Sequence, residues 1–170
     1  QESPLAIEYH SITSGRTDRE IVPFALLDNG SRWHVRAFDR KSQEFRDFVI
    51  TRIKNPVVMK GAAVQTHERS DQDIQWTRIV ELELVPHPDQ PRPEITEMDY
   101  SMDSGVLRMK LRAATASYIL RQWSVDCSPD HSLRGHEYRL WLKDHLALYG
   151  VRNAVLAPGY RSPVKSKGEQ

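Results

Sequence analysis

The sequence has one cysteine, almost no net charge and no long apolar run. Cys127 has no second cysteine to pair with, so an internal disulfide is excluded. No stretch approaches the roughly 18 apolar residues of a membrane-spanning helix. The polar N-terminus, which contains Pro4, does not match a signal peptide. These features predict a cytoplasmic protein without membrane contact, long enough at 170 residues to build one sizeable domain or two small ones.

Basic residues are concentrated in one part of the chain. Overall, 24 Lys and Arg face 23 Asp and Glu, so the chain is not built as a general nucleic-acid coat. Residues 32–54, however, hold seven basic side chains and only three acidic ones. This local excess of positive charge marks the stretch as a candidate binding region.

The basic stretch has the pattern of a β-hairpin. Two alternating runs flank a polar turn at residues 39–44, and successive strand side chains point to opposite faces. The first run predicts a buried face of three apolar residues, Trp33, Val35 and Ala37. Its other face would alternate flat rings with cations, in the order His34, Arg36, Phe38 and Arg40.

Arginines next to flat rings fit the recognition of a phosphorylated ligand. A guanidinium group offers a planar fork of donors that matches phosphate and stacks on rings. The plainer alternative is a solvated strand face whose arginines pair with Asp39, Glu44 and Asp47. The pattern alone leaves both interpretations open.

The residues around the hairpin predict a small β-barrel. Alternation predicts strands at 5–12 and 17–27, with a bulge or an edge position at Pro23 because proline cannot donate to a ladder. Residues 55–59 would close the barrel. The loosely patterned remainder, up to residue 75, would be a loop or a linker.

The second half of the chain predicts a small α/β module. Strands are expected at 76–86 and 106–111, and helices at 91–102 and 113–123. A further helix with His145 on its packed face is expected between residues 138 and 149.

No motif in the sequence predicts a metal, a cofactor or catalysis. Six residues invite a metal hypothesis, but their spacing fits no zinc pattern: Asp126, Cys127, Asp130, His131, His136 and His145. There is no nucleophile elbow, phosphate-binding glycine loop, zinc-protease helix or suggestive pair of carboxylates. An enzyme is therefore not expected.

The ordered series of motifs resembles the WYL-domain family of bacterial transcriptional regulators. Trp33-His34-Val35 stands at the place of the family's Trp-Tyr-Leu, followed by Arg36-Ala37-Phe38-Asp39 and a return strand at 45–53. Further along, 86–88, 97–102 and 111–121 resemble the extension found in regulators of phage-defence operons of the BREX and CBASS kind. Histidine and valine in place of the family's tyrosine and leucine are departures that bear on the ligand.

The resemblance implies an α+β fold with a Sm-like or SH3-like WYL barrel that senses a ligand over residues 1–70. An α/β extension at 71–160 would dimerise, and the small polar residues of 161–170 predict a disordered tail. The implied function is the sensing and dimerisation region of a repressor, expected to control a phage-defence operon. A nucleotide or short nucleic-acid effector would control operator DNA binding by an N-terminal winged helix-turn-helix outside this chain.

The expected effector site combines cations, rings and a hydroxyl. Arg36, Arg46 and Arg52 would contact phosphate, and His34, Phe38 and Tyr9 would stack or hydrogen-bond, with Ser11 adding a hydroxyl. A core position for Tyr9 and a turn-forming role for Ser11 are the plainer alternatives. The alternative function is a stand-alone barrel that binds single-stranded nucleic acid, with affinity that rises with ligand length and falls steeply with salt.

Overall fold

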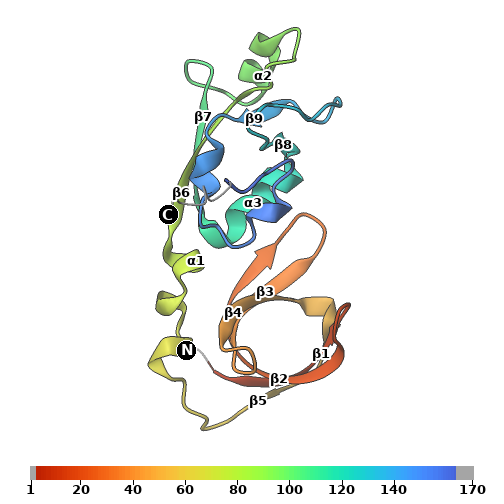
Figure 1. The fold of residues 1–170 in the computed structure, drawn as a ribbon. Coiled ribbons are helices and arrows are strands. Elements are labelled where there is room, and N and C mark those ends of the chain that lie inside the picture. The colour runs from red at the N-terminus through yellow and green to blue at the C-terminus, as the bar shows by residue number, and fades with distance from the viewer. Residues whose placement is uncertain (1–2, 164–170) are drawn as a thin grey trace, which may run out of the picture. The chain divides into compact units, whose positions relative to one another are not determined.

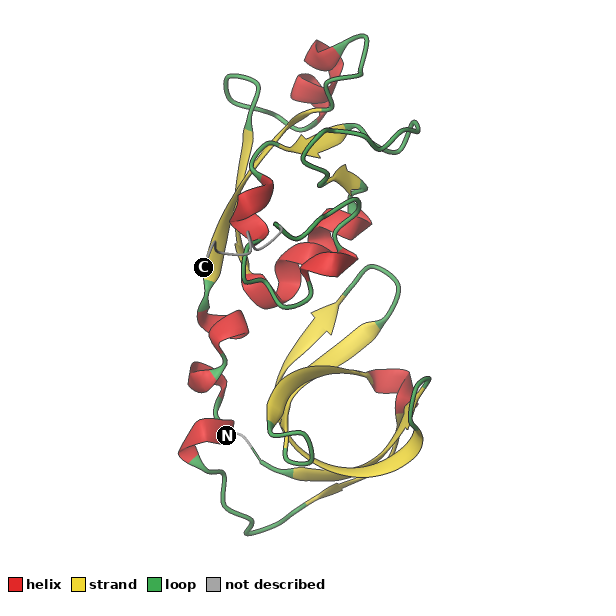
Figure 2. Ribbon diagram, in the orientation of Figure 1, coloured by secondary structure: helices red, strands yellow, loops and turns green. Residues whose placement is uncertain are grey.

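The computed structural model describes residues 3–163. The chain divides after Thr77 into two compact units, and both contain strands and helical turns (Figure 2), which confirms a mixed α+β class. Residues 71–77, assigned from the sequence to the second module, lie in the first unit. Of the predicted disordered tail at 161–170, residues 164–170 lie outside the described part of the chain.

The first unit is built on one antiparallel sheet with the strand order β4-β3-β2-β1-β5. Its elements are β1 (Leu5–Ser11), β2 (Gly15–Asp28), β3 (Trp33–Asp39), β4 (Glu44–Val49), the 3₁₀ turn η1 (Ile50–Arg52) and β5 (Ile53–Val58). The sheet curls strongly on itself (Figure 1). Within residues 3–163, however, β4 and β5 remain the two edges of the pairing order, so a closed hydrogen-bonded barrel is not found.

Several local predictions for this unit are confirmed. The basic stretch forms the hairpin of β3 and β4, which pair antiparallel. The register of β2 against β3 shifts between Pro23 and Ala25, where a bulge was expected. The strand expected at residues 55–59 corresponds to β5, which pairs with β1, but it forms an edge of the sheet and does not close a barrel.

Both faces of this sheet carry buried side chains. Directly opposite residues share a face, so the register puts Val35 with Phe48 on one face and Arg36 with Asp47 on the other. The first, here called the core face, carries a buried apolar cluster of Ile7, Tyr9, Ile21, Ala37 and Phe48. The prediction that Trp33 is buried is wrong. Its side chain is 55% exposed because Trp33 begins β3 at the end of the hairpin with β2.

Residues 65–77 form a strap over the second face, here called the strap face, which carries His34, Arg36 and Phe38. The strap consists of two 3₁₀ turns, η2 (Thr66–Glu68) and η3 (Ser70–Gln72), and the short helix α1 (Ile74–Thr77). Figure 1 shows it running outside the curled sheet. The interpretation of this segment as a mere loop or linker is therefore wrong in part, because it leads into the second unit and also covers the sheet.

The second unit packs one helix and several turns on a four-stranded sheet of order β7-β6-β9-β8. Its elements are β6 (Ile79–Pro86), α2 (Pro93–Asp99), β7 (Leu107–Arg112), α3 (Ala113–Gln122), β8 (Val125–Asp126), β9 (Leu140–Leu142), η4 (His145–Leu148) and η5 (Ala154–Leu156). Fully buried leucines form the centre of its core, among them Leu82, Leu84, Leu120, Leu140 and Leu142. No helix within residues 3–163 is long and apolar enough to cross a membrane.

Sequence patterns place most of these elements correctly. The predicted helices around α2 and α3 and the strand β7 are confirmed. The predicted strand at 76–86 begins only at Ile79, because residues 74–77 are helical. The helix expected between 138 and 149 is wrong. Its first part forms β9, where Leu142 pairs with Leu84 of β6, and only the 3₁₀ turn η4 follows.

Candidate functional site

Arg36 is the most heavily paired cation of the predicted site. Its side chain is almost fully buried, at 7% exposure. Its Nε and Nη2 donate to the two carboxylate oxygens of Asp73 at 2.5 and 3.1 Å, and its Nη1 donates to Asp47 at 2.8 Å. Asp73 belongs to the strap and Asp47 to β4. All three guanidinium nitrogens of Arg36 are thus engaged by carboxylates of the first unit.

The electrostatics keep this arginine charged. Burial alone would lower the pKa of Arg36, because desolvation disfavours the charged form. The hydrogen bonds and charges of Asp73 and Asp47 outweigh that effect and raise the pKa of Arg36 above its ordinary value. The strap face therefore holds a permanent buried cation whose counter-charges come from the protein.

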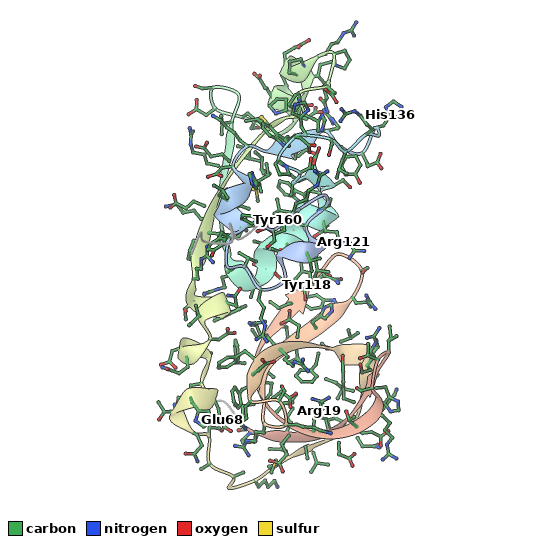
Figure 3. All side chains as sticks on the ribbon, viewed as in Figure 1. Arg19, Glu68, Tyr118, Arg121, His136 and Tyr160 are labelled. Carbon is green, nitrogen blue, oxygen red and sulfur yellow. The ribbon has the colours of Figure 1, made fainter. Side chains whose placement is uncertain are left out.

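Arg40 repeats the arrangement at the other end of the strap. Its Nε and Nη2 donate to the two carboxylate oxygens of Glu68 at 2.7 and 2.9 Å. Glu68 also accepts from the backbone N–H of Gln65, with which it forms a reciprocal capping box. The hydrogen bond from Arg40 holds the pKa of Glu68 below its usual range. Figure 3 labels Glu68 on the strap.

An aromatic cluster also connects the sheet to the strap. Phe38 contacts Phe45 and the strap residue His67 edge-on, with ring centroids 5.1 and 5.3 Å apart. Phe24, the residue at the β2 bulge, contacts Phe45 at 6.0 Å and Trp76 of the strap at 5.6 Å. Edge-on ring contacts of this kind add to the stability gained from burial. The strap is therefore fastened by apolar packing as well as by charge.

His34 and Phe38 are buried with Arg36 on this face. His34 is 6% exposed and Phe38 is 4% exposed. The Nδ1 of His34 lies 3.1 Å from the backbone carbonyl oxygen of Arg32. In this arrangement neither ring presents a free surface on which a ligand could stack.

Tyr9 and Ser11 belong to the other side of the sheet. Tyr9 is part of the core-face cluster, 5.0 Å edge-on from the ring of Phe48, and its hydroxyl accepts from the backbone N–H of Val49 at 3.2 Å. Ser11 ends β1, and its hydroxyl is 3.0 Å from the hydroxyl of Thr13 in the turn that follows. This geometry matches the plainer alternatives, namely a core position for Tyr9 and a turn position for Ser11.

The two remaining predicted arginines are more accessible. Arg46 lies opposite Ala37, so it points to the core-face side, and its half-exposed side chain is 3.7 Å from Glu44. Arg52 lies in η1 and is partly exposed. The structure thus brings His34, Arg36 and Phe38 together under the strap and leaves the other predicted residues elsewhere.

Sequence patterns missed the residues that occupy the predicted site. Asp73 and Glu68 approach from positions 37 and 28 residues away. The sequence patterns also did not predict the ion pair in which Arg19 donates to the fully buried Asp39 at 2.5 Å. Figure 3 shows Arg19 within the curl of the sheet. The one local signal for the strap was the acidic residue at the third position of η2, which caps that turn.

The histidines and acidic residues of the second unit do not form a metal centre within residues 3–163. Asp126 instead accepts from His87 Nε2 at 3.0 Å, and from the backbone N–H and hydroxyl of Ser128 at 2.8 and 2.7 Å. Burial opposes ionisation of Asp126, but these bonds outweigh it and lower its pKa. Burial raises the pKa of the Cys127 thiol well above its usual range. Asp126 is therefore a structural residue that ties His87 to the segment 128–133, and Cys127 is a residue of the apolar core.

Two family models match the two units. The model of the WYL domain matches residues 1–58, and that of the BrxR transcriptional regulator C-terminal dimerization domain matches residues 79–148. The chain belongs to the WYL-domain family of transcriptional regulators. The strap of the WYL unit lies between the two matched regions and ends where the BrxR-type domain begins.

Curated relatives in several bacteria match most of this chain. The DNA-binding transcriptional repressor CapW of Pseudomonas aeruginosa is 34% identical over 125 residues, which are 72% of this chain and 40% of CapW. CapW of Escherichia coli strain KTE188 is 31% identical over 134 residues, 77% of this chain and 44% of the relative. The chain therefore spans less than half the length of these curated relatives.

A solved structure adds a distant likeness. The proteasome accessory factor B/C (PafBC) of Arthrobacter aurescens matches 70% of this chain and 21% of its own, with a TM-score of 0.36 and 16% sequence identity.

Proposed function

We propose that this chain is the effector-sensing and dimerisation region of a DNA-binding repressor that controls a phage-defence operon. The WYL domain would sense a nucleotide or a short nucleic acid, and the BrxR-type domain would hold two copies together. Operator DNA would be bound by a part of the longer protein outside this chain. The family membership and the CapW relatives support the regulatory role.

One observation carries the sensing proposal. Asp73 occupies the guanidinium fork of Arg36 with two oxygens, in the geometry that a phosphate group would adopt. Glu68 does the same at Arg40. We infer that an anionic effector competes with these two carboxylates and takes their place on the arginines.

This competition would couple ligand binding to a movement of the strap. Removing Asp73 and Glu68 from their arginines would uncover His34 and Phe38 for stacking. Residue 77 ends the strap and β6 begins two residues later, so the strap is covalently continuous with the BrxR-type domain. A ligand shifts an equilibrium between two states only by its different affinity for them. Here the two states are the strap bound to its arginines and the strap released from them, and the effector would bind the released state more tightly.

The other predicted contacts take a secondary place in this proposal. Arg46 and Arg52 are accessible without strap movement and would contact an effector that reaches beyond the strap face. Tyr9 and Ser11 would contribute by supporting the sheet. We further propose that the curled sheet is a small barrel of the Sm-like or SH3-like kind, whose remaining closure is made by side chains.

The second candidate function is a barrel that binds single-stranded nucleic acid without acting as a sensor. The exposed cation Arg46 and the partly exposed Arg52 favour it. A binder that tracks the backbone gains affinity with each added nucleotide and loses it steeply with salt. A sensor saturates with a short ligand, so a length series at two salt concentrations separates the two functions.

The sensing proposal is tested by titrating the chain with adenosine monophosphate, a cyclic dinucleotide and a 5′-phosphorylated trinucleotide. The variant Asp73→Asn removes the competing charge from Arg36, so it should bind the effective ligand about tenfold more tightly than the natural chain. Arg36→Ala should abolish that binding.

Asp71→Asn is the matched control, because Asp71 is an exposed carboxylate of the same strap. It should leave affinity unchanged. If Asp73→Asn and Asp71→Asn bound every probe as the natural chain does, Asp73 would be only a structural partner of Arg36. The proposed competition would then be wrong.

Dimerisation has its own test. Sedimentation equilibrium of this chain should give twice its mass of 19.7 kDa at micromolar concentration. A monomer at 100 micromolar would contradict the proposed role of the BrxR-type domain, whatever the outcome for the effector.

A further inference from the structure

The BrxR-type domain contains an open cleft of about 650 Å³ that the proposed function does not use. One wall is the segment 87–96, which leaves β6 and enters α2, and the other is the segment 133–139, which leads into β9. Because Pro86 pairs with Leu140, both walls start from the same end of two adjacent strands. A hydrogen bond from the backbone N–H of His87 to the carbonyl oxygen of Arg139 ties them together at 2.9 Å.

Three arginines contribute to the lining of the cleft. Arg92, Arg134 and Arg139 are among its lining residues, with a single carboxylate, Asp89. Arg134 contacts Asp89 at 2.8 Å, but its side chain remains 63% exposed. The side chain of Arg92 is exposed and makes no ion pair or hydrogen bond within residues 3–163. His136, on the second wall, is also exposed (Figure 3).

A partly buried hydrogen-bond chain links the two walls of the cleft. The guanidinium of Arg139 pairs with Asp99 at 2.6 Å and also donates to the hydroxyl of Thr96 at 3.0 Å. That hydroxyl lies 2.7 Å from Oε1 of Gln90. Arginine can only donate, so the Thr96 hydroxyl must give its own hydrogen to Gln90. The amide oxygen of Gln90 is therefore occupied, and its amide nitrogen is the end of the side chain left to donate to a ligand.

The cleft also has an apolar side. Pro91, Ile95, Leu133 and Tyr138 are among its lining residues, and Ile95 is 45% exposed. A volume of this size lies in the range of small-molecule sites, which combine apolar walls with a few convergent polar groups. Cations beside an apolar wall and an amide donor match the three parts of a nucleotide, namely its phosphate, the face of its base and an acceptor on the edge of the base.

We propose that this cleft binds a nucleoside monophosphate group, either free or at the phosphorylated end of a short oligonucleotide. Arg92 and Arg134 contact the phosphate, the base lies against Ile95 and Tyr138, and Gln90 donates to the base edge. The site belongs to the second unit alone and is independent of the strap.

The test is an NMR titration of the chain with adenosine 5′-monophosphate, adenosine and inorganic phosphate. The amides of residues 87–96 and 133–139 should shift with the monophosphate, which should bind at least tenfold more tightly than adenosine. A trinucleotide with and without its 5′-phosphate distinguishes a free nucleotide from an oligonucleotide end, according to which phosphorylated ligand binds more tightly.

Three variants sharpen the result. Arg92→Glu should weaken monophosphate binding about tenfold or more, because it reverses an exposed charge of the cleft. Arg121→Glu, an exposed arginine at the end of α3 and outside the cleft lining, should change it less than twofold (Figure 3). Ile95→Ala should weaken binding of the monophosphate but leave that of inorganic phosphate unchanged.

Several outcomes would overturn the proposal. They are shifts confined to other residues, equal affinity for adenosine and its monophosphate, an unaffected Arg92→Glu variant, or no binding of either phosphorylated ligand at 5 millimolar. Asp73→Asn separates this site from the strap proposal, since it should leave monophosphate binding at residues 87–96 unchanged.

Discussion

The two units of this chain place their arginines in opposite settings. In the WYL domain, Arg36 is buried and all its nitrogens donate to carboxylates. In the BrxR-type domain, Arg92 and Arg134 are exposed at the edge of an open cleft. Local sequence does not distinguish these cases. The burial of each guanidinium, together with the number of carboxylates that the fold brings to it, decides whether the arginine fastens the structure or remains available to a ligand.

The largest effect is expected from Asp73→Asn. Removing one partner of a buried ion pair is costly, and the variant leaves Asp47 as the remaining carboxylate on Arg36, so the first unit should lose about 3 kcal/mol of stability. Peptide-resolved hydrogen exchange of β1 to β5 in increasing urea measures this loss. Asp71→Asn should change stability by less than about 0.5 kcal/mol. Equal losses in both variants would contradict the special role of Asp73.

The next effect concerns the second unit. Asp126→Asn should destabilise that unit by about 2 kcal/mol, because a buried carboxylate that accepts several hydrogen bonds loses its charge. The buried thiol of Cys127 reports the opening of this unit, since burial and its raised pKa keep it unreactive in the folded state. Thiol labelling in urea at pH 8 should therefore begin at a lower urea concentration in the variant. If labelling of Cys127 began at the same urea concentration in the variant and in the natural chain, the expectation would be wrong.

The same residue predicts an acid dependence. The folded-state pKa of Asp126 lies below its ordinary value, so its contribution to stability is complete above the unfolded pKa of about 3.9. That contribution is lost as the pH falls through the lower folded-state pKa. Acid unfolding followed by circular dichroism between pH 5 and pH 2 should show a shallower loss for Asp126→Asn. An unchanged profile would mean that other groups dominate.

A smaller effect is expected at the other strap fastening. Glu68→Gln keeps the size of the side chain but loses the charge-assisted bonds from Arg40, which should destabilise the strap by about 1 kcal/mol. Hydrogen exchange of residues 65–77 should rise by about fivefold. Glu20→Gln is the control, because Glu20 is the half-exposed second partner of Arg40. A comparable rise in the control would remove the distinction between the two partners.

The smallest effect should follow Arg46→Ala. Arg46 lies in the same hairpin as Arg36, but its side chain is half exposed, and the distance of 3.7 Å from its Nε to the carboxylate of Glu44 is long for an ion pair. Exposed pairs of this kind contribute little, so urea unfolding of the first unit should change by less than about 0.5 kcal/mol. A loss as large as that of Asp73→Asn would show that exposure does not separate the two arginines.

Local patterns in the sequence were sufficient for much of the fold. The alternation around residues 33–53 predicted the β3–β4 hairpin, Pro23 predicted the β2 bulge, and helical spacing of apolar residues predicted α3. Each of these depends on neighbours within one element. The helix predicted between residues 138 and 149 was wrong because pairing of β9 with β6 overrides the helical spacing of its apolar residues.

The candidate site was harder to predict because it depends on register and on a distant segment. A shift of one residue moves every side chain of a strand to the other face, and the observed register puts Arg46 on the face opposite to Arg36. Glu68 lies in a short 3₁₀ turn, and Asp73 lies between another such turn and the four-residue helix α1, so neither belongs to a segment with an apolar period. Nothing local shows that their carboxylates reach β3, so burial of the predicted face could not be foreseen.

The most direct test of the central claim measures the strap itself. Hydrogen exchange of residues 65–77 is followed in the natural chain with and without whichever titrated ligand saturates it, the 5′-phosphorylated trinucleotide being tried first. If an anionic effector replaces Asp73 and Glu68 on their arginines, exchange in the strap should increase several-fold while exchange in β1 and β2 stays constant. Saturable binding with unchanged or slower exchange in the strap would contradict the account.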